Sequence, residues 1–466
     1  MAYQLAHTSG PMAREIQGSS FRELKIVQNG EVNMEGVISR PEDIKIVFWD
    51  SSRHKKAVAN DSGFLMLQLL GDCLGLISKQ EWSGLQKVVE PSFRASTSNS
   101  YLPFNRQSTK QFLETLLPQG HDKPSQYALN PLEDLKMLPF RIVTNIIYRK
   151  LDKEISRLES LIPLRESLWN HMIAGGVIRY RWSRYLPLET NKKLRAWKEQ
   201  WESFNNHAAS KARYLYEKSN GETQKPTILD LYSAIEKRQI SFPQALQTID
   251  EMLFANLDVT MGGISWNLVF LAENGAAQDK LKAEIDSLQN VHRGTFRSVP
   301  EDWIPDAYNI SSKTFLHACI LESARLRPLA AFSVPQSAPT SRIVVRGEGS
   351  CGYLIPPNTN FVIDSHALNI HNHYWGSSRE ERETYCPERF LQQKGTELRY
   401  NYWRFGFGPR QCLGKHVADL IIKQALIQLL SNYKILRQIL GSKLEVNLDS
   451  GSWITHPDVL LRLEKK

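Results

Sequence analysis

The sequence predicts a mainly helical protein with a small β subdomain and one long central helix. Helical periodicity dominates residues 132–274, and a single apolar helix is expected from about residue 241 to residue 273. Short strands are expected near residues 32–39, between residues 343 and 363, and at the C-terminal end. The 466 residues suffice for a large core around a bulky ligand. We expect residues 1–20 to be a polar segment without a membrane anchor and residues 21–466 to form one domain.

The N-terminal half begins with the partly alternating residues 32–39, after which Pro41 starts a short helix. An apolar segment over residues 64–77 precedes a helix that carries Trp82 and is expected to end at Pro91, because proline disfavours a helix interior. Taken alone, Trp82 indicates ordinary core packing. Charged amphipathic helices follow and carry four tryptophans: Trp169, Trp182, Trp197 and Trp201.

The central helix begins with a capping serine, Ser241, and an early proline. Its residues 253–272 match the length of a membrane-spanning helix, but they include Asp258, so a buried core helix is the stronger interpretation. Asn256, Asp258 and Thr260 lie in an apolar setting, where polar groups cost free energy unless they are paired or used. These three residues are therefore candidate functional groups.

The C-terminal third begins with a helix over about residues 312–326, in which Glu322 and Arg325 share one face. Such pairs are common as solvated salt bridges, so this pair alone is weak evidence. Three short strands are expected at residues 343–345, 353–355 and 360–363. A segment without strands follows at residues 375–390, then a helix at residues 415–436 and a terminal hairpin near residues 453–460.

Composition argues against several classes of protein. The five cysteines are scattered, odd in number and without a C-x-x-C pair, which argues against a disulfide framework and against a zinc finger. Lysine and arginine total 58 against 49 acidic residues, and the excess is spread along the chain instead of forming a basic run. We therefore expect no nucleic-acid partner, and we assign the basic balance to an acidic protein or an anionic membrane surface.

Residues 405–414, FGFGPRQCLG, place one cysteine between glycines and beside an arginine, just before a helical pattern. Glycines permit tight turns that direct backbone N–H groups toward a sulfur, which is a suitable environment for a metal-bound thiolate. Arg410 is suited to an anionic ligand group because of its planar fork of donors. The alternative is a glycine-rich turn around an ordinary buried cysteine, and the local pattern leaves both interpretations open.

Four features occur in one order within residues 30–460: Asp258 in the central helix, the Glu322–Arg325 pair, the segment Pro387–Phe390, and the loop pattern F-x-x-G-x-R-x-C-x-G. Together they resemble the cytochrome P450 family. The resemblance implies the cytochrome P450 fold, with the central helix lying across a bound haem.

The resemblance also implies roles for individual residues. Cys412 matches the axial thiolate ligand of the haem iron. Further haem contacts are implied for Arg410, Trp82 and Phe405, the first two at a propionate. A structural charge cluster behind the haem is implied for Glu322, Arg325 and Arg389. His416, next to the loop, is expected to be a packing or surface residue.

Three departures from the family pattern are visible. Many members place an arginine four residues after the tryptophan, where this chain has Gln86 followed by Lys87. Many also place a second arginine after the helix of the Glu/Arg pair, where this chain has Pro335 and Gln336. Only Arg410, and as an alternative Lys87, then remains to neutralise the propionates.

The third departure is Val259, which stands where the family usually has an alcohol for proton delivery to dioxygen. The hydroxyl of Thr260 is displaced by roughly 100° around the helix. We therefore predict that protons arrive through water held by Asp258 and Asn256, or through a polar hydrogen of the substrate.

Several segments, among them residues 47–54, 70–75 and 328–333, are similar to filamentous-fungal members of epithiodiketopiperazine toxin pathways. This similarity implies a substrate derived from a cyclic dipeptide. The positions that match substrate-facing segments are Asn256, Leu257, Ala331, Phe332 and Ile454. Such a set suits a compact, mostly apolar ligand held by few hydrogen bonds.

The expected function is a haem-thiolate monooxygenase of fungal secondary metabolism. No flavin segment or G-x-G-x-x-G pattern is visible, so electrons are expected from NADPH through a partner cytochrome P450 reductase, docked on a basic face around Lys415. The alternatives are radical coupling, desaturation or isomerisation at the same haem, or haem binding without turnover. By family analogy, the expected localisation is the surface of the endoplasmic reticulum membrane. Because the chain is expected to lack an anchor, the alternative localisation is the cytoplasm.

Overall fold

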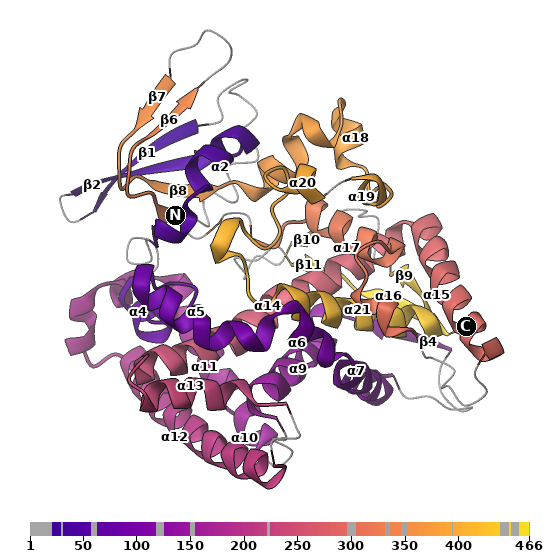
Figure 1. Ribbon diagram of the computed structural model, residues 1–466, viewed down its shortest axis with the longest axis horizontal. Helices are drawn as coiled ribbons and strands as arrows, with labels where there is room; N and C mark the ends of the chain where they lie inside the picture. Colours follow the sequence, from indigo (N-terminus) through magenta and orange to yellow (C-terminus); the bar gives the residue numbers. More distant parts are fainter. Residues whose placement is uncertain are drawn as a thin grey trace.

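The structure is a computed structural model that describes residues 21–28, 31–56, 63–117, 125–149, 154–220, 224–295, 304–330, 333, 336–345, 352–393, 395–438, 447–448 and 456–465. Helices form most of it, and the β-rich part lies to one side (Figure 1). The predicted mainly helical fold class with a small β subdomain is thereby confirmed.

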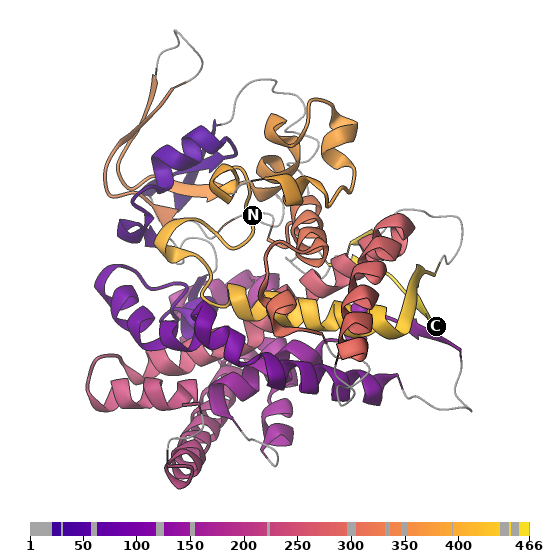
Figure 2. The same cartoon turned by 45° about the vertical axis from the view of Figure 1, so that its right-hand side comes forward.

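The first group of helices builds the part of the molecule that lies opposite the β-rich part in Figures 1 and 2. In chain order they are α4 (Gly63–Leu70), α5 (Lys79–Phe93), α6 (Ala95–Ser100), α7 (Leu102–Leu116), α8 (Pro131–Asp134), α9 (Met137–Tyr148), α10 (Ile155–Glu159), α11 (Ile162–Ala174), α12 (Glu189–Lys218) and α13 (Thr227–Glu236). Between α11 and α12 the chain forms two 3₁₀ helices, η2 (Gly176–Arg179) and η3 (Arg181–Tyr185).

Helix α14 (Phe242–Glu273) is the predicted central helix, and its start is well determined by sequence. The Ser241 side chain accepts from the Gln244 N–H, and the Gln244 side chain accepts from the Ser241 N–H, which completes a capping box. The helix packs against α9, against α17 (Phe315–Leu326) and against α21 (Lys415–Asn432). Among the described helices, none has the length and apolar character required to cross a bilayer.

The remaining helices surround α17 and α21. They are α15 (Gly275–Thr295), α16 (Asp306–Ile310), the π-helix η4 (Ala367–His371), the 3₁₀ helix η5 (His373–Trp375), α18 (Arg379–Glu383), α19 (Arg389–Gln392) and α20 (Gly395–Leu398). The segment predicted to lack strands thus consists of short helices and turns that lie beside the end of α17.

The largest sheet joins strands from distant parts of the chain in the order β1-β2-β8-β5-β3. Its strands are β1 (Phe21–Gln28), β2 (Glu31–Ile38), β3 (Lys55–Lys56), β5 (Gln336–Ser337) and β8 (Asn360–Ile363). Helix α2 (Pro41–Phe48) follows β2, as predicted, and the 3₁₀ helix η1 (Ser51–Arg53) follows α2.

The described residues also form three smaller sheets, whose strands are β4 (Gln126–Leu129), β6 (Arg342–Val345), β7 (Gly352–Ile355), β9 (Tyr433–Arg437), β10 (Asn447–Leu448), β11 (Pro457–Asp458) and β12 (Leu461–Lys465). The predicted strands near residues 343, 353 and 360 are present as β6, β7 and β8. The position of Trp453 lies outside the described residues. Strands β10 and β11, on either side of it, pair antiparallel as the expected local hairpin requires, and β12 pairs with β4 and β9.

Two predicted helix ends were wrong. Helix α5 continues through Pro91 to Phe93, where the buried side chains of Val89 and Phe93 tie its last turn to the core. Helix α21 ends at Asn432, because the following residues pair as strand β9 with β12, and this long-range pairing overrides the helical sequence pattern.

The loop of residues 405–414 joins two of the hydrophobic cores. Phe407 packs in the small core between the large sheet and α2, while α21, directly after the loop, packs in the main helical core. Figure 2 shows this segment running between the β-rich part and the helices before it enters α21. The cysteine that it carries is therefore held between two rigid parts of the fold.

Candidate active site

The backbone of the loop is shaped by two glycines. Gly406 and Gly408 have φ angles of +87° and +69°, a region that favours glycine. A Cβ atom at Gly408 would also lie 2.6 Å from Ser51 Oγ in η1. The turn then closes through a hydrogen bond of 2.9 Å from the Cys412 N–H to the Phe405 carbonyl. The glycines thus let the loop pack against η1 and present Cys412 at the start of α21.

The thiol of Cys412 lies beside the first turn of α21. Burial of Sγ raises the pKa of the thiol, even though the residue as a whole keeps an exposed surface, and the backbone N–H of Gly414 and the ammonium group of Lys415 act in the opposite direction. A metal ion would supply the positive charge that a thiolate in this position requires. The four cysteines in the described part of the chain are free thiols.

Arg410 lies against Trp82, two residues before the cysteine. Its guanidinium carbon is 5.0 Å from the centre of the Trp82 ring, and its Nη2 donates to the Ile77 and Gly75 carbonyls at 2.6 and 3.4 Å. Burial lowers the pKa of Arg410 to about 10. Its Nη1 is buried and has no hydrogen-bond partner among the described residues. Such a donor requires an anionic partner, so Arg410 fits the propionate of the implied haem.

The predicted charge cluster is assembled around Glu322, whose side chain is fully buried. Arg325 makes two hydrogen bonds to it, at 2.7 and 2.8 Å, and Arg389 makes a third at 3.1 Å. The Cys386 N–H donates to the same carboxylate at 3.0 Å. Arg325 also donates to the Asn369 carbonyl and lies over the Trp375 ring. These contacts fasten the segment before the cysteine loop to α17.

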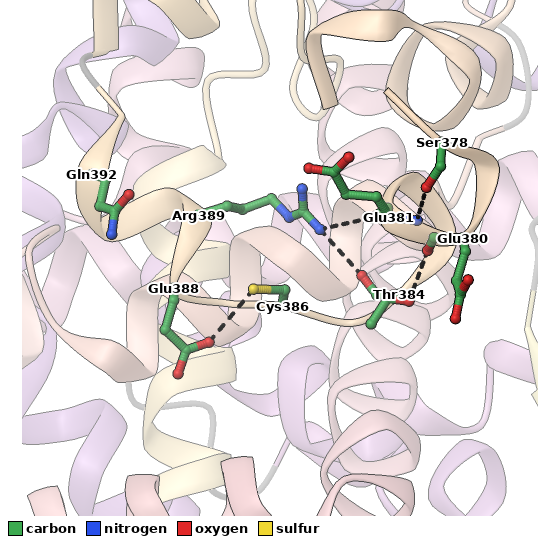
Figure 3. A pocket seen from close by; sticks show the side chains of 8 residues that line it. All are labelled: Ser378, Glu380, Glu381, Thr384, Cys386, Glu388, Arg389 and Gln392. Carbon is green, nitrogen blue, oxygen red and sulfur yellow. Dashed lines mark hydrogen bonds between the residues drawn. The ribbon is translucent and has the colours of Figure 1, made fainter. Parts of the chain in front are cut away.

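The outer side of this cluster faces a surface pocket of about 540 Å³ (Figure 3). Its lining residues are Ser378, Glu380, Glu381, Thr384, Cys386, Glu388, Arg389 and Gln392. Arg389 donates to the carbonyls of Glu381 and Thr384 there. The pocket contains no residue that the sequence places at the haem or the substrate, so we regard it as the outer wall of the charge cluster.

In the middle of α14 the side chains of successive residues meet different surroundings. Val259 is 38% exposed, whereas Thr260 is 4% exposed and engaged within the protein. Asp258 lies between buried and exposed, and burial raises the pKa of its carboxyl, an effect that His456 partly opposes. The structure therefore gives Val259, and not Thr260, the accessible position on this turn.

His456 is a residue that sequence reasoning missed. Its Nε2 lies 2.8 Å from the backbone oxygen of Asp258, which accepts the hydrogen bond. The approach depends on Gly262, because a Cβ atom there would lie 2.9 Å from the His456 ring and 2.4 Å from Leu329. The glycine pair within an apolar helix was the available signal for this close approach.

Glu251, also on α14, is a second residue that the sequence did not reveal. It accepts from the Gly75 N–H at 3.1 Å, and a Cβ atom at Gly75 would lie 2.1 Å from its Oε1. Burial raises the pKa of Glu251, and Arg410 lowers it. The carboxylate thus links the central helix to the segment that also holds Arg410.

The other predicted site residues have less structural evidence. Phe405 is half-buried beneath the Arg404 guanidinium, at 4.4 Å from ring centre to guanidinium carbon, and His416 is half-buried on the first turn of α21. Lys87 is exposed on α5. Five predicted substrate or proton-delivery positions fall outside the described residues or have side chains that do: Asn256, Leu257, Ala331, Phe332 and Ile454.

Comparison with known proteins extends these observations to nearly the whole chain. Residues 32–458 match the family model described as cytochrome P450. The cytochrome P450 monooxygenase aclC of Aspergillus oryzae is 41% identical over 99% of this chain and 90% of its own length. The monooxygenases asaD of Aspergillus flavus and gliC of Aspergillus fumigatus are 37% and 35% identical, over 100% and 90% of this chain and 86% and 78% of their own lengths.

Proposed function

Because the chain belongs to the cytochrome P450 family and is an oxygen-incorporating oxidoreductase, we propose that it oxidises a compact, mostly apolar metabolite derived from a cyclic dipeptide. The observation that carries the proposal is the pairing of a cysteine thiol at the start of α21 with an arginine donor that is buried and unpartnered in the described structure. This pair suits two parts of a haem, the iron at its centre and the propionates at its edge. The fungal relatives support a role in secondary metabolism.

In this proposal the haem supplies dioxygen activation, and the protein supplies ligation, charge and orientation. Cys412 would hold the iron, with the Gly414 N–H tuning the electron density on its sulfur. Arg410, positioned by the Ile77 carbonyl and the Trp82 ring, would bind a propionate. The cluster around Glu322 keeps the chain before the loop in place, so its role is structural.

Proton delivery is proposed to run through Asp258. Its raised pKa lets the carboxyl hold and release a proton closer to neutral pH than an exposed aspartate does. Val259 offers no hydroxyl at the accessible position, and Thr260 is directed into the packing. A water molecule or a polar hydrogen of the substrate would then complete the route. Since this arrangement delivers protons less directly, desaturation or radical coupling is the second candidate outcome at the same site.

Electrons are proposed to come from NADPH through an acidic reductase. Exposed Lys79 and Lys87 lie on α5, the helix whose Trp82 contacts Arg410, and Lys415 follows the cysteine loop directly. We assign these three lysines to the docking face because their helices carry or directly follow the residues that would hold the haem. Complementary charge of this kind accelerates and orients the docking of a partner.

Association with a membrane surface is proposed for the segment of residues 177–186. It exposes apolar and aromatic side chains that are interleaved with three exposed arginines, and these residues are Val177, Arg179, Tyr180, Arg181, Trp182, Arg184, Tyr185 and Leu186. Aromatic residues with a polar edge and basic residues favour the headgroup region of an anionic membrane. This segment supports a peripheral contact with a membrane surface, and the endoplasmic reticulum is proposed as that membrane by family analogy.

The function is tested with purified holoenzyme, a fungal reductase, NADPH and a panel of cyclic dipeptides, followed by mass analysis of the products. We expect a product enlarged by one oxygen atom that depends on NADPH, on the reductase and on Cys412. Cys386→Ser is the matched control for Cys412→Ser, and it should keep the thiolate-type spectrum of the reduced, CO-bound protein. A product that forms without NADPH would instead support isomerisation, and a thiolate-type spectrum without turnover of any substrate would support haem binding alone.

A further inference from the structure

The turn of α14 that carries Asp258, residues 258–261, has one hydroxyl group, and that group is buried. It belongs to Thr260, which is 4% exposed and engaged within the protein, whereas the accessible residue Val259 is apolar. Proton delivery is proposed to run through Asp258, so the orientation of its peptide decides where its carboxyl group lies. A side chain from near the C-terminal end, His456, contacts that peptide.

The contact joins the imidazole of His456 to the main chain of the helix. Its Nε2 lies 2.8 Å from the carbonyl oxygen of Asp258. Because a carbonyl oxygen only accepts hydrogen bonds, Nε2 must carry the hydrogen, and the contact fixes the tautomer of a neutral ring. His456 is 5% exposed, so the hydrogen bond is largely withdrawn from competing water.

The helix itself supplies another donor to the same oxygen. In an α-helix the carbonyl of residue 258 accepts from the N–H of residue 262, and α14 is helical at both positions. The imidazole is therefore a second donor that approaches from outside the helix. Carbonyls that bond to a donor outside their helix tilt outward, and their helical hydrogen bonds lengthen slightly. The orientation of the Asp258 peptide thus depends on His456 as well as on the helix.

Gly262 supplies the helical donor and also makes room for the imidazole. A Cβ atom at this position would lie 2.9 Å from Cδ2 and 3.2 Å from Nε2 of His456, and 2.4 Å from Leu329. Any other residue at position 262 would displace the ring or the leucine. Glycine weakens a helix interior, so the close approach, and not helix stability, accounts for the glycine here.

The backbone that carries His456 is supported by β structure. His456 directly precedes β11, which pairs with β10 and packs against α14. The next residue, Pro457, has a fixed φ angle and also restricts the backbone of the residue before it. The imidazole is therefore presented to the helix from a restrained position.

We propose that His456 is a positioning residue for proton delivery, because its Nε2–H holds the Asp258 peptide, and with it the Asp258 carboxyl group, in the orientation that serves the haem site. This inference rests on the proposed haem-thiolate function and deepens its proton route. With each NADPH, dioxygen and proton consumed, the enzyme forms either one molecule each of monooxygenated product and water, or one molecule of hydrogen peroxide without product. The ratio of peroxide to product therefore reports on proton delivery.

The first test measures this ratio in variants of His456, with holoenzyme, reductase, NADPH and a cyclic dipeptide that the parent oxidises. The amide nitrogen of glutamine reaches the place of Nε2, that of asparagine reaches only the place of Nδ1, and leucine has no donor. We expect His456→Leu and His456→Asn to raise the ratio about five- to tenfold, the factor that one hydrogen bond supplies, and His456→Gln to stay within about twofold of the parent. The control His207→Leu, at an exposed site on α12, should leave the ratio unchanged.

The second test asks whether His456 acts through Asp258. In an Asp258→Asn background, His456→Leu should change the ratio by less than about twofold, because the group that the histidine positions has already been removed. A histidine that instead shaped the substrate pocket would raise the KM and would act equally in both backgrounds. That outcome would overturn the inference.

A third measurement needs no turnover. In ferrous, CO-bound protein labelled with nitrogen-15 histidine, the ring signal that disappears in His456→Gln should show a hydrogen on Nε2. A bare Nε2 would overturn the inference, as would an unchanged peroxide ratio in His456→Leu. If the parent forms no NADPH-dependent product from any substrate, the proposed function fails instead, while the ring signal still decides whether the contact exists.

Discussion

Substitution of Glu322 by glutamine tests how the segment before the cysteine loop is held. The carboxylate is fully buried and receives two hydrogen bonds from Arg325, one from Arg389 and one from the Cys386 N–H. Glu322→Gln keeps the shape of the side chain and removes its charge. The fully buried guanidinium of Arg325 would then lack a counter-charge, because its other described partners are the Asn369 carbonyl and the Trp375 ring.

Breaking a buried ion pair by neutralising one partner costs about 3–5 kcal/mol. Unfolding entropy is about 2 cal/mol/K per residue, which gives about 1 kcal/mol/K for 466 residues, so the melting temperature should fall by about 3–5 °C. Arg389→Met leaves the Glu322–Arg325 pair intact and should cost less, about 1.5–3 kcal/mol, because it removes charge-assisted hydrogen bonds only. The measurement is thermal and denaturant unfolding of the haem-bound protein, followed by circular dichroism.

The matched control is the exposed pair between Arg379 and Glu383, which has the same 2.7 Å separation of charged atoms. Arg379→Gln should leave the free energy of unfolding almost unchanged, since exposed ion pairs contribute little. Equal losses for Glu322→Gln and Arg379→Gln would refute the reasoning, because burial would then have no effect. A double variant, Glu322→Gln with Arg325→Met, should recover part of the loss by removing the uncompensated cation.

Four further predictions address other parts of the site. Gly408→Ala should destabilise the protein by about 1–3 kcal/mol in unfolding experiments and accelerate haem loss, because its φ is positive and a Cβ would strike Ser51; Gly395→Ala, at an open position, should do neither. Burial lowers the pKa of His54 to about 4, below the value of 6.5 in an unfolded chain, so its contribution to stability is complete above pH 6.5 and is lost as the pH falls toward 4. Between pH 7.5 and pH 4, the free energy of unfolding of His54→Gln should therefore fall by up to about 3 kcal/mol less than that of the parent protein. His207→Gln, at an exposed site, is the contrasting control, and equal acid sensitivity of the two variants would contradict the prediction. Val259→Thr should lower peroxide release per NADPH consumed and raise product yield, while unchanged values of both would refute the proposed proton route. The double variant Trp182→Ser with Tyr185→Ser should co-sediment less with phosphatidylserine vesicles, whereas the exposed control Tyr214→Ser should not. Equal binding by the parent, the double variant and the control would contradict the proposed membrane contact.

Local patterns predicted the elements that local chemistry determines. The start of α14 was predictable because Ser241 and Gln244 form their capping box within four residues. The i, i+3 spacing placed Glu322 and Arg325 on one face, and the glycine pattern indicated a tight turn before Cys412. In each case the residues that make the contact are close in sequence, so their spacing carries the information.

Long-range pairing decided the features that sequence analysis missed. Residues 433–436 continue a helical pattern, yet they form a strand because β12, near the C-terminal end, supplies a partner. His456 meets the Asp258 carbonyl across about 200 residues, and the approach is possible because Gly262 carries no Cβ atom. A single sequence does not encode which distant segment will fill such a gap.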